Sequence, residues 1–105
     1  MKLSSDLIKS LATYTANLKD DISIVLQKGS HEKRDQIVTF LEDVCSVSDK
    51  LIFEESDLGS SQRSPLSFTL FSNGINSGVT FSGIPGGHEF NSFVLAILQL
   101  GGADL

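Results

Sequence analysis

The sequence is poor in the residues that build redox and metal centres. Its 105 residues include one cysteine and two histidines. The single cysteine, Cys45, excludes an internal disulfide, a CxxC redox pair and a cysteine-based zinc site. His31 and His88 lie far apart in the sequence and do not have the spacing of a metal site. We therefore expect no bound metal.

Long apolar runs and clusters of basic residues are also lacking. The longest apolar stretch worth testing, 94–100, falls short of the ~18 residues that a membrane helix needs, and the N-terminus does not form a secretory signal. The net charge is -5, and only two of the eight basic residues, Lys33 and Arg34, are adjacent. Nucleic-acid affinity rests on clustered lysine and arginine. We therefore expect a cytoplasmic protein that binds neither nucleic acid nor membrane.

The length and the hydrophobic pattern predict a single domain that spans residues 1–105. Apolar residues at three- and four-residue steps predict helices, and short β-branched runs predict strands. The expected elements are a helix in roughly the first eighteen residues, strands at 22–26, 51–53, 66–71 and 79–82, and helices at about 33–48 and 87–100. Turn residues at 72–74 and 76–78 indicate a hairpin, and Gly101 and Gly102 suit a left-handed C-cap.

The order of these elements predicts the fold class. A strand–helix–strand unit requires a parallel crossover, whereas two strands joined by a short turn pair antiparallel. One mixed four-stranded sheet flanked by helices, with helices on both of its faces, satisfies both requirements. The sequence therefore predicts an α/β protein with a thioredoxin-like fold.

The position where thioredoxin-like folds hold their dithiol has no cysteine here. That dithiol lies between the first core strand and the next helix, whose N-terminus lowers the pKa of a thiol. The corresponding loop, 28–34, contains no cysteine. Cys45 lies well inside the second helix on its apolar stripe, where a buried structural thiol is favoured over a reactive one. Pro65 stands where such folds often keep a cis-proline, although a trans proline that begins a strand is equally allowed.

The segment 83–102 joins a glycine-rich bend to an apolar helix that has His88 and Glu89 in its first turn. The bend matches neither of the phosphate-binding patterns GxGxxG and GxxxxGK(S/T), so an ordinary turn is the favoured interpretation. Glu89 has two interpretations. An acid near a helix N-terminus stabilises the helix by about 0.3–1 kcal/mol, and a functional carboxylate would occupy the same position.

The segment 81–90, FSGIPGGHEF, resembles the end of the first thioredoxin-like fold in the N-terminal domain of the F subunit of alkyl hydroperoxide reductase. The segments SDKLIF at 48–53 and SPLSF at 64–68 resemble other parts of the same family in the same order. The resemblance extends over essentially the whole chain and is most specific at the GHEF helix.

The resemblance implies a role in an electron-transfer system. The F subunit is a flavoprotein that passes electrons from NADH through FAD and a central dithiol to its N-terminal domain, which reduces a peroxiredoxin that destroys peroxides. That domain has two thioredoxin-like folds in tandem, and only the second carries a CxxC. On this basis the chain is an N-terminal fragment, the redox-inactive first fold, of a parent protein that is expected to be a homodimer. It binds no cofactor itself, because FAD and NADH belong to the parent.

The resemblance also implies a role for Glu89. The glutamate of the GHEF motif, which follows Gly87 and His88 here, faces the dithiol of the second fold and can act as an acid or a base as the thiols titrate. The alternative is a freestanding, non-catalytic thioredoxin-like interaction module, whose contact surface would draw on seven phenylalanines and the acidic charge. Several hundred further residues with a CxxC would favour the first hypothesis, and a stop codon near Leu105 the second. Neither predicts enzymatic activity from this chain alone.

Overall fold

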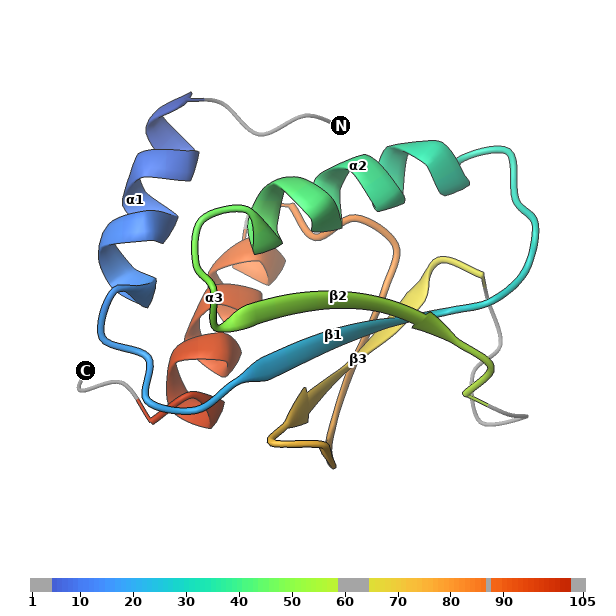
Figure 1. Ribbon diagram of the computed structural model, residues 1–105. Helices are drawn as coiled ribbons and strands as arrows, with labels where there is room; N and C mark the ends of the chain where they lie inside the picture. Colours follow the sequence, from blue (N-terminus) through green and yellow to red (C-terminus); the bar gives the residue numbers. More distant parts are fainter. Residues whose placement is uncertain (1–4, 59–64, 87, 103–105) are drawn as a thin grey trace.

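The computed structural model describes residues 5–58, 65–86 and 88–102. Its elements, in chain order, are α1 (Ser5–Thr15), β1 (Ile22–Gln27), α2 (Arg34–Cys45), β2 (Leu51–Ser56), β3 (Ser67–Ser72), β4 (Ile75–Ser82) and α3 (His88–Leu100). Each expected element is present, and Figure 1 labels all of them except β4. α1 and α2 are shorter than predicted, and β2 and β4 are longer. None of the described helices is long and apolar enough to cross a lipid bilayer.

The strands form one mixed sheet in the order β2-β1-β3-β4. β1 and β2 are parallel, with Ile22 opposite Leu51, because α2 returns the chain to the same end of the sheet. β3 runs antiparallel to both β1 and β4. This strand order and these directions confirm the predicted thioredoxin-like α/β fold.

The prediction of helices on both faces of the sheet is wrong for the described residues. α2 and α3 cover the same face, because the ring centroid of Phe93 on α3 lies 6.0 Å from that of Phe40 on α2 and 5.5 Å from that of Phe68 on β3. α1 packs against both α2 and α3. Figure 1 shows α2 above the sheet and α1 beside the other two helices. The fully buried residues that β1 contributes to this core are Ile22, Ile24 and Leu26.

The opposite face of β3 and β4 carries paired hydroxyl side chains. Oγ of Ser67 lies 3.0 Å from Oγ of Ser82, and Oγ1 of Thr69 lies 2.9 Å from Oγ1 of Thr80. Such cross-strand pairs stabilise the sheet and give the polar atoms hydrogen-bond partners within it. This part of the face therefore offers little apolar surface for a helix to bury.

The hairpin between β3 and β4 turns at Asn73 and Gly74. Both residues have positive φ angles, 52° and 82° respectively. An Asn-Gly pair adopts such angles readily, and a two-residue turn of this kind matches the twist of the flanking strands. The turn predicted at 72–74 is therefore confirmed.

The prediction of turn residues at 76–78 is wrong. These residues belong to β4, and the pairing of β4 with β3 changes register between Thr69 and Phe71. The hydroxyl of Ser77 donates a hydrogen bond to the carbonyl oxygen of Leu70 at 2.6 Å. The polar and glycine residues that looked like a turn thus form an irregularity within an edge strand, where bulges are common.

The end of α3 is fixed to the connection between α1 and β1. The carbonyl oxygen of Gly101 accepts hydrogen bonds from the N–H groups of Lys19 at 2.8 Å and Asp20 at 3.0 Å. Gly102 has a φ of 74°, the left-handed conformation that a glycine C-cap adopts. The C-cap predicted from the Gly-Gly pair is confirmed.

Candidate functional site

The first residue of α2, Arg34, binds the end of the sheet where a dithiol would stand in a redox-active relative of this fold. Its Nη1 donates hydrogen bonds to the carbonyl oxygens of Gln27 at 2.7 Å and Pro65 at 2.6 Å. Its Nη2 lies 3.3 Å from Oε2 of Glu55, and only 14% of the Arg34 side chain is exposed. One guanidinium therefore joins the end of β1, the end of β2 and the segment that leads into β3.

Sequence reasoning did not assign this role to Arg34. A cation in the first turn of a helix opposes the helix dipole, so its presence there is a signal that other groups hold it. Those groups could not be identified in advance because Pro65 is 31 positions away along the chain. Only the folded chain brings them together.

Pro65 lies against the cysteine-free loop, where thioredoxin-like folds place their conserved proline. A Cβ atom built on Gly29 would lie 2.8 Å from Cγ of Pro65, and the φ of Gly29 is +145°. Glycine is therefore required at position 29 both for space and for backbone conformation. The peptide bond that precedes Pro65 involves Ser64, which lies outside the described residues, so its cis conformation stays a prediction.

The glycine-rich bend before α3 lies beside the start of α2. Gly83 and Ile84 line a hollow of about 310 Å³ together with Lys33, Ile37 and Leu66. The pairing of Ser67 with Ser82 and of Leu26 with Phe68 places these segments at one end of the sheet. The fold therefore gathers the loop without cysteine, the Pro65 segment and the bend that leads to the GHEF helix at the same end.

Glu89 is exposed in the first turn of α3. Its backbone N–H donates to the carbonyl oxygen of Gly86 at 3.1 Å. Among residues 5–58, 65–86 and 88–102, no side chain forms a hydrogen bond or ion pair with its carboxylate. His88 is also exposed, and Gly87 lies outside the described residues. The carboxylate of Glu89 is thus accessible to a group from another domain, and its role in proton transfer stays a prediction.

Cys45 does not provide a reactive thiol. It is partly buried and packs against the hydrophobic core, at the position where a buried structural thiol was predicted. Burial, and secondarily the charge of Glu42, raise the pKa of Cys45 from 9.0 to about 12. Because the thiolate is the nucleophile, this thiol is inert near neutral pH. In the described part of the chain, no cluster of histidine, cysteine and acidic side chains is placed to hold a metal ion.

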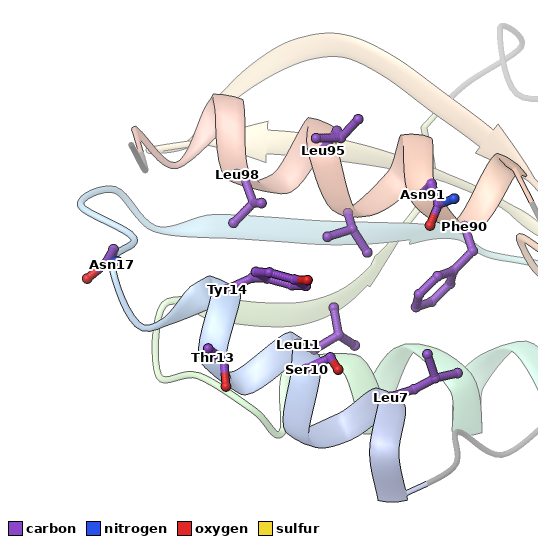
Figure 2. A pocket seen from close by; sticks show the side chains of 11 residues that line it. Leu7, Ser10, Leu11, Thr13, Tyr14, Asn17, Phe90, Asn91, Leu95 and Leu98 are labelled. Carbon is purple, nitrogen blue, oxygen red and sulfur yellow. The ribbon is translucent and has the colours of Figure 1, made fainter. Parts of the chain in front are cut away.

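A groove of about 930 Å³ runs between α1 and α3 (Figure 2). The residues that line this α1–α3 groove are Leu7, Ser10, Leu11, Thr13, Tyr14, Asn17, Phe90, Asn91, Val94, Leu95 and Leu98. Figure 2 shows Leu7 near Phe90 at one end and Tyr14 near Leu98 toward the other. Apolar periodicity identifies the apolar face of a helix but not whether another element covers it. The sequence therefore did not predict this groove.

Comparison with known proteins agrees with the predicted fold and with the family resemblance. No family model matches the chain. The F subunit of the Staphylococcus aureus alkyl hydroperoxide reductase, AhpF, is 39% identical over 100 residues, which are 95% of this chain and 19% of that protein. The corresponding protein of Staphylococcus epidermidis is 37% identical over the same shares of the two chains. The chain is homologous to the N-terminal region of AhpF. The resemblance predicted from the sequence is thereby confirmed.

Solved structures of AhpF support the same assignment. The crystal structure of the NTD_N/C domain of the Enterococcus faecalis protein matches with a TM-score of 0.81 at 27% identity, over 94% of this chain and 53% of that one. A variant of the Enterococcus faecalis AhpF matches with a TM-score of 0.82 at 26% identity, over 96% of this chain and 53% of that one. The chain thus spans about half of these structures and about a fifth of the curated relatives.

Proposed function

We propose that the chain is the redox-inactive thioredoxin-like half of the N-terminal electron-shuttle domain of an AhpF protein. In this role it supports the transfer of electrons from NADH and FAD, through a dithiol, to a peroxiredoxin. The main observation in support of the proposal is the position of Arg34. Its guanidinium donates hydrogen bonds to two backbone carbonyls at the end of the sheet where the fold would hold a dithiol. With Cys45 inert, the chain itself has no thiol suited to disulfide exchange.

The parts that carry electrons belong to the rest of the parent protein. These are a second thioredoxin-like fold with a CxxC, the FAD site and the NADH site. We expect the parent protein to be a homodimer in the cytoplasm. The chain matches only 19% of its curated relatives, which leaves ample length for those parts. We expect no reduction of a small disulfide substrate by the 105-residue chain alone.

Glu89 is the residue of this chain that we assign to the reaction. A carboxylate that faces the dithiol of the second fold can accept the proton of the attacking thiol and return it when the thiol is released. The exposure of Glu89 in the first turn of α3 supports this assignment. The competing interpretation is that Glu89 only stabilises the helix N-terminus.

The test uses a chimera in which this chain replaces the matched 100 residues of the Staphylococcus aureus AhpF. We expect Glu89→Gln to slow NADH-dependent reduction of the peroxiredoxin by about 10²-fold or more, the usual effect of losing a general acid or base. The pKa of the nucleophilic cysteine, measured by thiol alkylation against pH, should shift as well.

The matched control is Asp6→Asn, which removes an exposed acid from the first turn of α1. It should lower thermal stability slightly and leave the kinetics unchanged. If Glu89→Gln behaves like Asp6→Asn in both measurements, Glu89 is a helix-stabilising residue and its proposed role is incorrect.

A further inference from the structure

The hollow of about 310 Å³ between the start of α2 and the bend before α3 contains one ionisable side chain. Its lining residues are Lys33, Gln36, Ile37, Leu66, Gly83 and Ile84. Lys33 carries the charge, and the walls contributed by Ile37, Leu66 and Ile84 are apolar. A charge beside low-dielectric walls interacts more strongly with an approaching ion than a charge surrounded by water does. The hollow is therefore suited to an anionic group from outside this chain.

The ammonium group of Lys33 has no partner in the described part of the chain. The ion pairs found there involve Arg34 and Lys50 instead. The backbone N–H of Lys33 donates to Nδ1 of His31 at 3.0 Å, whereas its side chain is exposed. A cation at the start of a helix is repelled by the helix dipole, so α2 gains no stability from this charge. The positive charge of Lys33 is thus available to a group from another domain.

Backbone hydrogen bonds fix the path from the hollow to Glu89. The N–H of Gly83 donates to the carbonyl oxygen of Leu66 at 2.9 Å, and the N–H of Glu89 donates to that of Gly86 at 3.1 Å. The bend from Gly83 to Gly86 therefore connects the wall of the hollow directly to the first turn of α3. A group that approaches Glu89 from this end of the sheet also approaches Lys33.

We propose that Lys33 stabilises the thiolate of the dithiol in the neighbouring thioredoxin-like fold. This inference rests on the proposed function, in which Glu89 faces that dithiol. A nearby cation favours the thiolate over the thiol, and only the thiolate attacks a disulfide. Lys33 and Glu89 thus act in opposite directions, because the ammonium favours loss of the thiol proton and the carboxylate can receive that proton.

The other charged and titratable groups near Lys33 do not replace it. The guanidinium of Arg34 is held by two backbone carbonyls and by Glu55. His31 accepts the N–H of Lys33 at Nδ1, which requires a neutral imidazole. The remaining ionisable residues of the loop and of the start of α2 and α3 are exposed and do not line the hollow: Lys28, Glu32, Asp35, His88 and Glu89. Lys33 therefore supplies the positive charge of the hollow.

The experiment compares Lys33→Met and Lys33→Arg in the Staphylococcus aureus chimera. Each protein is reduced with NADH, and the rate at which iodoacetamide alkylates the nucleophilic cysteine of the CxxC is measured against pH by mass spectrometry of the labelled peptide. Lys9→Met is the matched control, because Lys9 is exposed on α1, which lies beside the far end of α2 (Figure 1). Thermal unfolding of each variant establishes that it is folded.

We expect Lys33→Met to slow alkylation at acidic pH by at least about threefold, because one charge close to the thiol changes its ionisation by that order. At alkaline pH, where the thiol is ionised in every variant, the rate should not change. Lys33→Arg keeps the charge and, like Lys9→Met, should match the unaltered chimera. Added salt should reduce the effect of Lys33→Met, because salt screens exposed charges. A purely structural effect would persist at every pH and salt concentration.

The proposal is overturned if Lys33→Met matches the unaltered chimera at every pH while Glu89→Gln speeds alkylation at acidic pH. The role of Glu89 then stands without Lys33. It is also overturned if Lys33→Met and Lys9→Met slow alkylation equally, because net charge alone then accounts for the effect. If neither Lys33→Met nor Glu89→Gln changes the pH profile, the dithiol does not face this end of the sheet and the roles of both residues are incorrect.

Discussion

Nη1 of Arg34 lies 2.6 Å from the carbonyl oxygen of Pro65 and 2.7 Å from that of Gln27. A charged donor shared between two carbonyls forms stronger hydrogen bonds than a neutral donor does. In this chain, the end of the sheet that serves redox chemistry in other members of the fold is therefore held together by a structural cross-link.

Removal of that cross-link should destabilise the protein. We expect Arg34→Met to lower the free energy of unfolding by about 2–3 kcal/mol, because it leaves two part-buried carbonyls without their donor. Urea denaturation followed by circular dichroism measures this. Lys50→Met is the control, since Lys50 and Asp21 form an exposed ion pair at 3.7 Å and such pairs contribute at most about 1 kcal/mol. Equal losses for the two variants would contradict a structural role for Arg34.

The close approach of Pro65 to Gly29 gives a second prediction. Gly29→Ala should cost about 1–3 kcal/mol, because alanine is strained at a φ of +145° and its Cβ would contact Cγ of Pro65 at 2.8 Å. Gly86→Ala provides the comparison, since no atom lies within 4 Å of a Cβ at that position and its φ is not positive. Thermal unfolding measures the stability of both variants. If Gly29→Ala is as stable as Gly86→Ala, the loop can move away from Pro65.

Phe93 should be among the side chains on which stability depends most. Its ring is fully buried and lies 5.5 Å from those of Phe68 and Phe81 and 6.0 Å from that of Phe40. We expect Phe93→Ala to cost about 3–5 kcal/mol, the usual loss for a buried phenylalanine. Ile75→Ala should change the free energy of unfolding by less than about 0.5 kcal/mol, because that side chain is exposed. A loss below about 1 kcal/mol for Phe93→Ala would mean that the ring cluster does not form the centre of the core.

Cys45 should make stability depend on alkaline pH. Its pKa in the folded protein is about 12 against an ordinary value of 9.0, so above pH 9.0 the unfolded chain loses the thiol proton first. The contribution to stability is therefore complete below pH 9.0 and is lost progressively as the pH rises toward 12. The difference in unfolding free energy between the native protein and Cys45→Ala, measured by urea denaturation, should accordingly decrease over this range. A difference that stays constant with pH would show that the thiol has an ordinary pKa.

The element order could be predicted because it depends on local patterns. The β-branched run of β1, the apolar stripe of α2 and the Asn73-Gly74 turn each determine structure from neighbouring residues alone. The segment 76–78 was misassigned for the same reason. Its residues suit a turn and a bulge equally, and only its pairing with β3 distinguishes the two.

By itself, the sequence determined the order of the helices and strands, the loop without cysteine and the homology that the GHEF helix indicated. Tertiary structure decided that α2 and α3 cover the same face of the sheet, that Arg34 binds the carbonyl of Pro65 and that α1 and α3 leave an apolar groove between them. The physical reason is range. Backbone conformation depends on residues a few positions away. A side chain such as that of Arg34 reaches a distant partner such as Pro65 only after the intervening chain has packed.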